Sequence, residues 1–249
     1  MRKPYSSRFD ALEATHYDML YQTPSSFDAI LWEIERSAIR EILDRHVGRT
    51  VDKSLLDFAC GTGRILRHLE NDFQTATGVD VSPAMTALAH ERVRKARIVV
   101  GDMINDASLL PGPFDVITVF RFFLNAEPTL REQALLALRK RMHEKSVLIA
   151  NVHGSCPSLR SLTIRIKSAL QRGNEQEDIN EISQRDFRLL AKRCGFEVVE
   201  TVGLGLLTPK IATLLSAQVI RAIERWGYKL GIGRWVGSDV IYVLRPLRN

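Results

Sequence analysis

A turn of small residues after a short apolar run carries the strongest signal for ligand chemistry in this chain. The run ends at Asp57 and continues as Phe-Ala-Cys-Gly61-Thr-Gly63, and helically spaced apolar residues begin at Ile65. Glycine lacks a Cβ and tolerates positive φ, so this turn lets backbone amides approach a ligand at the positive end of a helix. A nucleotide-like ligand suits such a turn. Leu66 stands where a dinucleotide fingerprint would place its third glycine, which argues against NAD.

Polar residues also follow the next three apolar runs, namely Asp80 after 74–79, Asp102 after 98–100 and Arg121 after 114–120. In an open parallel sheet, ligands bind at the carboxyl ends of the strands, so we expect these residues at one edge of a sheet. From that edge the carboxylate of Asp80 can accept hydrogen bonds from both hydroxyls of a ribose.

Four motifs, in this order and each after a strand, resemble the class I S-adenosylmethionine-dependent methyltransferases. They are Asp57-Phe-Ala-Cys-Gly-Thr-Gly, Gly78-Val-Asp80-Val-Ser, Gly101-Asp102-Met103 and Phe114-Asp115-Val-Ile. The resemblance covers residues 50–152 well and the remainder in outline. It implies an α/β, Rossmann-like fold: a seven-stranded, mostly parallel sheet with helices on both faces and an antiparallel last strand. It also implies S-adenosyl-L-methionine as the cofactor.

The resemblance implies a role for each matching position. At the methionine part it places Gly61, Gly63, Asp57 to orient the turn or the amino group, and the backbone carbonyl of Phe120 at that amino group. At the adenosine part it places Asp80 on the ribose, the adjacent Val81, Asp102 at the adenine amine and Met103 beside the ring. Cys60 departs from the glycine often found there. Structural alternatives stay open, because the glycines can simply shape a turn and the two aspartates can cap whatever follows them.

Residues 1–48 are expected to form N-terminal helices over 8–22 and 27–46, the second with an apolar stripe. In the family that the chain resembles, similar leading helices with tyrosines lie over the bound cofactor. Tyr17 and Tyr21 are therefore candidates for contacts with the cofactor. The alternative is a tyrosine packed at the edge of the core.

The second half continues the alternation of helices and strands, with helices over 129–142 and 183–194 and strands over 146–152, 196–202 and 240–244. His153 follows a strand at the ligand edge and titrates near neutrality, so it is the candidate catalytic base for a hydroxyl acceptor. Arg121 is the candidate for steering an anionic acceptor. A polar loop role for His153, and an ion pair of Arg121 with Glu127 or another carboxylate, are the alternatives.

Two segments, 155–182 and 205–237, are expected to form caps or insertions on a single domain spanning 1–249. The first contains a basic amphipathic stretch. The second predicts one helix with an apolar side, from Ile211 to Trp226, and a basic side. We expect the apolar side to cover the substrate pocket. The alternative is peripheral contact with an anionic membrane surface.

The composition is that of one ordinary globular domain. Of 249 residues, 45% are hydrophobic and 26% are charged, enough for one substantial core. No stretch approaches the about 18 apolar residues of a membrane span and the start lacks a secretory signal, so we expect a cytoplasmic protein, with contact at the inner face of the membrane as an open alternative. Three separated cysteines show no metal spacing, so we expect no metal site.

We expect a methyltransferase that acts on a small molecule, at oxygen, with a saccharide or another cell-envelope precursor as the candidate acceptor. The Asn/Asp-Pro-Pro-aromatic signature of base-amine methyltransferases is absent, since the chain has Phe120-Arg-Phe-Phe there. The net charge of +6 favours acidic partners only weakly, and no basic run resembles an RNA-reading motif, so nucleic acid is not the expected acceptor. An RNA or protein methyltransferase is the rival enzyme, and a non-catalytic cofactor-binding module is the rival of another class. The sequence leaves the oligomeric state open.

Overall fold

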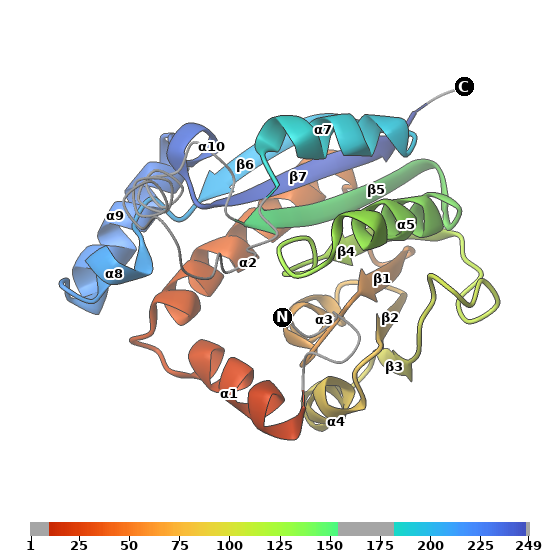
Figure 1. The fold of residues 1–249 in the computed structure, drawn as a ribbon, viewed down its shortest axis with the longest axis horizontal. Helices are drawn as coiled ribbons and strands as arrows, with labels where there is room; N and C mark the ends of the chain where they lie inside the picture. Colours follow the sequence, from red (N-terminus) through yellow and green to blue (C-terminus); the bar gives the residue numbers. More distant parts are fainter. Residues whose placement is uncertain (1–9, 154–181, 248–249) are drawn as a thin grey trace, which may run out of the picture.

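Seven runs rich in aliphatic and β-branched residues form one sheet in the computed structural model, which describes residues 10–153 and 182–247. The strands are β1 (Ser54–Phe58), β2 (Thr75–Asp80), β3 (Arg97–Val100), β4 (Phe114–Val119), β5 (Met142–His153), β6 (Phe196–Leu204) and β7 (Asp239–Pro246). Their order is β3-β2-β1-β4-β5-β7-β6 (Figure 1). β7 runs antiparallel to β5 and β6, and the other pairs are parallel. The predicted mostly parallel sheet with an antiparallel last strand is confirmed.

Helices cover both faces of this sheet. They are α1 (Ala11–Gln22), α2 (Phe27–His46), α3 (Arg64–Leu69), α4 (Pro83–Arg92), α5 (Pro128–Arg139), α7 (Gln184–Arg193), α8 (Pro209–Ala212), α9 (Ala217–Lys229) and α10 (Gly233–Val236). Successive strand residues point to opposite faces, so β1 and β4 each contribute side chains to two hydrophobic cores, one on each face of the sheet. Leu56 and Ile117 pack with α5 and α7, whereas Leu55 and Val116 pack with α2 and α3.

Helix α1 is held by its N-terminal cap and by an ion pair with α4. Asp10 accepts hydrogen bonds from the first-turn amides of α1, and the amide of Asp10 donates to the carboxylate of Glu13. This capping box fixes the start of the helix. α1 then packs on α2 and α4, where Asp18 pairs with Arg92.

The end of α5 departs from the prediction. The helix ends at Arg139 rather than at 142, and β5 begins already at Met142 rather than at 146. The reason is Arg141, a buried residue whose guanidinium donates hydrogen bonds to the backbone oxygens of Leu110 and Met103. These contacts join the loop before β4 to the start of β5. Periodicity cannot reveal them, because the partners lie far apart in the sequence.

The single helix predicted within 205–237 is wrong, because the structure has three helices there. Thr208 caps α8 and Ser216 caps α9, so the helix is interrupted between them. The predicted orientation holds only in part, because Ile220 is buried and Arg225 is exposed as predicted, but two other residues are not placed as predicted. Arg221 faces α2 and pairs with Glu33, whereas Trp226 is exposed. The predicted insertion 155–182 lies outside the described residues except for its last one.

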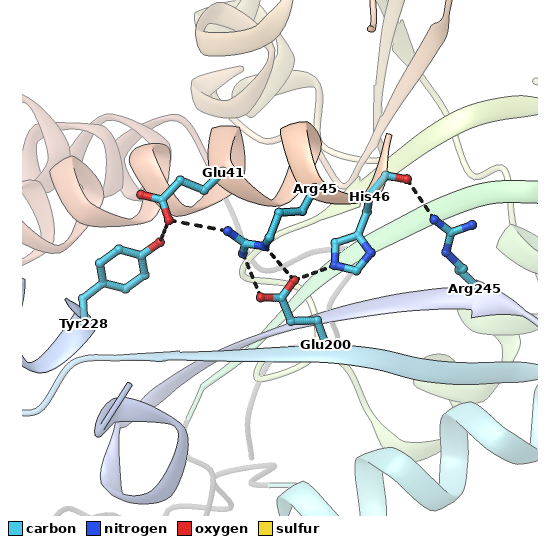
Figure 2. Close-up of polar contacts among 6 residues, drawn as sticks. All are labelled: Glu41, Arg45, His46, Glu200, Tyr228 and Arg245. Atoms are coloured by element: carbon cyan, nitrogen blue, oxygen red, sulfur yellow. Dashed lines mark hydrogen bonds and ion pairs between the residues drawn. The ribbon is translucent and has the colours of Figure 1, made fainter. Parts of the chain in front are cut away.

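A second set of polar contacts fastens the far end of α2 to β6 and α9 (Figure 2). Glu200 of β6 accepts hydrogen bonds from Arg45 and lies 2.5 Å from the ring of His46. Tyr228 of α9 donates to Glu41 at 2.6 Å. Burial would raise the pKa of Glu200, but the bonds from Arg45 and His46 outweigh it and lower that pKa. This group, completed by Arg245, is called the outer cluster below.

Candidate functional site

The turn between β1 and α3 brings backbone amides to the carboxyl edge of the sheet. Three of its residues have positive φ, which are Ala59 at 56°, Gly61 at 54° and Gly63 at 77°. Positive φ is unfavourable for alanine, so the turn is strained at Ala59. At Gly63, an added Cβ would lie 2.8 Å from a methyl group of Val93, and close packing against α4 therefore requires glycine.

Asp80, at the end of β2, ties this turn to the next one. Its two carboxylate oxygens accept hydrogen bonds from the amides of Gly61, at 2.8 Å, and Ser82, at 2.9 Å. Burial raises the pKa of Asp80, and these amide bonds only partly offset the effect. Ser82, not Asp80, caps α4, because its hydroxyl accepts from the amide of Met85. The amide of Val81 also donates to Asp80, so the two oxygens together keep one of their four lone pairs for a ligand.

Two cavities meet at Asp80. A smaller one, of about 50 Å³, is lined by predicted residues Tyr17, Asp57, Gly61, Asp80, Val81, Phe120 and Arg121. A larger one, of about 220 Å³, is lined by predicted residues Asp80, Val81, Asp102 and Met103. The two share Ala59 as well as Asp80 and Val81. The strand ends thus place most of the predicted site residues together, whereas Gly63 and Tyr21 line neither cavity.

Asp57 presents an unusual carboxylate to the smaller cavity. One oxygen accepts a hydrogen bond from the hydroxyl of Thr118 at 2.7 Å, and the other is buried without a partner among the described residues. Burial raises the pKa of Asp57 to about 7, although the bond from Thr118 and the charge of Arg64 act against it. Near neutral pH this side chain therefore responds readily to a nearby positive charge, which would drive it to the ionised form.

Arg121 presents the opposite charge to the same cavity. It sits at a positive φ of 61°, and its amide donates to the side chain of Asn151 at 2.7 Å. Its guanidinium lies 3.7 Å from Asp239, so the partner carboxylate is Asp239 rather than Glu127. The Nε atom of Arg121 is buried and has no hydrogen-bond partner in the described structure. Two residues that line one cavity thus have an unpaired carboxylate oxygen and an unpaired guanidinium N–H donor.

A buried polar network supports this wall, and the sequence analysis missed it. Glu35 of α2 pairs with Arg64 at 2.6 Å, and Asn151 donates one hydrogen bond to Glu35 and one to Asp239. The Arg64 guanidinium also lies 4.4 Å from the ring centre of Tyr21. The sequence held one signal, because Glu35 falls on the apolar stripe of its helix. A carboxylate in such a position must find a buried partner.

Asp102 follows β3 at the larger cavity, whereas His153 ends β5. Asp102 accepts hydrogen bonds from the amides of Ile104 and Asn105, so it caps the turn after β3 while it also lines the larger cavity. His153 is the last residue of β5 and is paired in register with Asp239. The side chain of His153 lies outside the described residues, and its role as a base stays a prediction.

Cys60 lies beside the turn as a small buried thiol. Burial, and then the nearby carboxylates of Asp57 and Asp80, raise the pKa of Cys60 well above its ordinary value. The thiol therefore stays protonated and is a poor nucleophile. Its side chain instead fills the space beside Gly78, where an added Cβ would lie 2.9 Å from the sulfur.

Residues 55–145 match a family model described as a methyltransferase domain. Over 87 residues the chain is 36% identical to dTDP-3-amino-3,6-dideoxy-alpha-D-glucopyranose N,N-dimethyltransferase of Streptomyces fradiae, covering 35% of this chain and 32% of the relative. Over 70 residues it is 43% identical to dTDP-4-amino-2,3,4,6-tetradeoxy-D-glucose N,N-dimethyltransferase of Saccharopolyspora spinosa, covering 28% and 27%. The chain therefore spans about a third of the length of these curated relatives.

Solved structures extend the likeness to the whole fold. Magnesium protoporphyrin IX methyltransferase from Synechocystis PCC 6803, with bound SAH, has a TM-score of 0.62 over 93% of this chain and 94% of that one. The sequence identity is 13%, so this likeness concerns the fold alone.

Proposed function

We propose that this chain, a member of the class I S-adenosylmethionine-dependent methyltransferase family, transfers a methyl group from S-adenosyl-L-methionine to a small-molecule acceptor. The observation that carries the proposal is a pair of unpaired polar atoms on two residues that line the smaller cavity. Asp57 Oδ2 and Arg121 Nε are both buried without partners in the described structure. Buried polar atoms of this kind normally find a hydrogen-bonding partner, and here a bound ligand can supply it. The methionine end of the cofactor carries an ammonium group and a carboxylate, which complement the two.

The rest of the cavity pair fits the adenosine end. Asp80 keeps a free lone pair beside its three backbone hydrogen bonds, which can accept a ribose hydroxyl. The larger cavity continues from Asp80 to Met103, Ile104 and Phe122, whose apolar side chains suit an adenine ring. Asp102 lines this cavity and accepts two backbone hydrogen bonds at Oδ1 and one from the Asn105 side chain at Oδ2, so its contact with the adenine amine rests on the remaining lone pair of Oδ2.

In this reaction the chain's own residues must bind the donor and keep it aligned with the acceptor. When bound, the cofactor would supply a methyl group on a positively charged sulfur. The acceptor atom would bond to the methyl carbon, and the sulfur would leave in line as a neutral thioether. The protein must hold donor and acceptor in that alignment, which is the main source of rate in such a transfer. Asp57, Arg121 and Asp80 fix the donor at three points. Tyr17 of α1 lines the smaller cavity and narrows its access to water.

A saccharide is the first acceptor class to test. Two relatives act, by name, on the amino group of dTDP-linked sugars, which supports nitrogen as the methylated atom. The matched stretches cover only about a third of each relative, so the support is limited to the class of acceptor. Oxygen, which the sequence analysis favoured, requires a base, and His153 is the candidate.

The direct test incubates the protein with labelled cofactor and candidate acceptors. We expect label to pass to a dTDP-linked amino sugar, or to one fraction of a metabolite extract, with equimolar S-adenosylhomocysteine. Label on RNA, together with salt-sensitive and near-stoichiometric RNA binding, would instead support the rival RNA methyltransferase. Binding of the cofactor without turnover on any small molecule, RNA or protein would support the non-catalytic module and overturn the proposal.

A further inference from the structure

The segment that joins β6 to β7 exposes a large amount of apolar surface. Among its side chains, Leu214 is 83% exposed, Trp235 67%, Trp226 61% and Leu230 56%. Ile211, Val219 and Val236 are exposed as well. Single exposed apolar residues are common, but so many in one short segment mark a surface that contacts something else. These seven residues, on α8, α9 and the α10 region, are called the α8–α10 surface below.

The segment is firmly built, so its exposed side chains have a fixed support. The buried carboxylate of Glu224 accepts hydrogen bonds from the amides of Leu206 and Leu207, at 2.9 and 2.8 Å. Gly227 packs so closely that an added Cβ would lie 2.0 Å from the side chain of Leu206. On the other side, a Cβ on Gly233 would lie 2.1 Å from the backbone oxygen of Gly203. The three helices lie together at one end of the molecule (Figure 1).

The charges of the segment are of one sign where they meet water. Lys210, Lys229 and Arg234 are exposed. The one acidic residue between 205 and 238 is Glu224, which is buried. Arg225 shares its partner carboxylate, Glu33 of α2, with Arg221, so one negative charge faces two positive ones. A second copy of this surface would meet it with like charges, so self-association through it is disfavoured.

Exposed indoles beside cations suit the boundary between water and an anionic bilayer. Tryptophan prefers the headgroup region, aliphatic side chains enter the acyl boundary, and Lys and Arg contact lipid phosphates. In the described part of the chain, no helix has the length and apolar character needed to cross a bilayer. Any contact with lipid through the described residues is therefore made at the surface.

We propose that the α8–α10 surface docks this protein on anionic phospholipid membranes. The segment leaves β6 at Leu204 and enters β7 at Asp239, and these two residues are paired in register. Asp239 in turn faces Arg121 of the smaller cavity, 3.7 Å away. The docked segment is thus directly joined to the wall of the candidate active site.

The test measures binding of the full chain to vesicles. Vesicles of phosphatidylcholine with 30% phosphatidylglycerol are compared with vesicles of pure phosphatidylcholine, by sedimentation and by tryptophan emission. We expect binding to the anionic vesicles, with a blue shift in emission and quenching by brominated lipids. The fluorescence is informative because two of the three tryptophans lie on this surface, whereas the third, Trp32, is half-buried and stacks on Arg64.

Matched variants locate the contact. The double change Trp226→Ala with Trp235→Ala removes exposed side chains and is expected to weaken partition by about tenfold or more. Leu189→Ala on α7, where the leucine is 51% exposed, is the apolar control and should leave it unchanged. Lys210→Glu with Lys229→Glu should abolish the preference for anionic lipid, whereas Lys192→Glu should not.

The outcomes separate this proposal from the proposed function. Cofactor binding is measured in solution, without lipid, and all these variants should retain it. Equal binding to both vesicle types, no binding to either, or no effect of the tryptophan variant would overturn the docking proposal. So would a dimer in light scattering that the tryptophan variant dissociates, because the surface would then bind a second copy.

Discussion

Helix α2 carries two ionic groups that differ in burial. The buried group supports the wall of the smaller cavity, whereas the exposed group only joins α2 to β6 and α9. Around Glu35 the carboxylate is 2% exposed and its partner Arg64 is 11% exposed, and the group borders the smaller cavity. In the outer cluster, Arg45 is 45% exposed and Glu200 26% (Figure 2). Removing two charges from water costs several kcal/mol, so a buried pair persists only where its geometry is tightly satisfied. The exposed group contributes little and tolerates loss.

The largest expected effect comes from breaking the buried pair. Glu35→Gln leaves the Arg64 charge in the interior without its carboxylate, and we expect a loss of about 3 to 5 kcal/mol in the free energy of unfolding. Urea unfolding followed by circular dichroism measures it. Glu33→Gln is the control on the same helix, because Glu33 pairs with the more exposed Arg221, and it should cost about 1 kcal/mol or less. Equal losses in the two variants would contradict the comparison.

The next largest effect is a dependence of the free energy of unfolding on pH, which comes from Asp57 in the candidate site. The folded-state pKa of Asp57 is about 7, above its ordinary value of 3.8, so the folded protein holds a proton that the unfolded chain has released. Stability from this group is present at low pH and is lost as pH rises from about 4 to 7. Between pH 5 and 7 the loss is on the order of 2 kcal/mol. Asp57→Asn should flatten this slope, measured by unfolding at several pH values.

The same side chain should report on the ligand. A cofactor ammonium near Asp57 favours the carboxylate, so binding should release a proton near pH 7. Calorimetry in buffers of different ionisation enthalpy measures that release. Asp57→Asn should bind without it. An unchanged proton release in the variant would assign the proton to another group.

The smallest effect belongs to the outer cluster. Glu200→Gln removes an exposed acceptor from Arg45 and His46, and we expect a loss of about 0.2 to 1 kcal/mol at pH 7. The pKa of Glu200 is lowered in the folded state, so this stabilisation is present above its ordinary pKa and is lost as pH falls. Cofactor affinity should not change. A variant that binds cofactor more weakly would show that the outer cluster also positions the site.

The sequence predicts the residues that gather at the edge of the sheet around Asp80 better than the buried network behind them, because the two groups differ in the sequence separation of their contacts. Gly61, Asp80 and Asp102 lie in turns directly after strands, and parallel strands bring their carboxyl ends to one edge. Their shared position follows from local pattern and topology alone. Asn151 and Glu35, in contrast, are 116 residues apart and meet only through the packing of α2 over β5.

Helix α9 illustrates the same limit. Its spacing shows which residues share a face, but not which face meets the protein. The structure turns the small Gly227 and the ion-pairing Arg221 toward neighbouring elements and leaves Trp226 outside. The basic side was predicted to face water, and for Arg221 this is wrong because its partner, Glu33, lies on another helix.

The central claim is that the edge around Asp80 binds S-adenosyl-L-methionine, and calorimetric titration with S-adenosylhomocysteine tests it most directly. We predict one equivalent bound per chain, with affinity reduced by at least about tenfold in Asp80→Ala because hydrogen bonds to a charged acceptor are lost. Asp80→Asn, which keeps one oxygen for the amide of Gly61 or Ser82, guards against a variant that fails to fold. No binding by the folded wild-type chain, while NAD or another nucleotide binds in its place, would contradict the account.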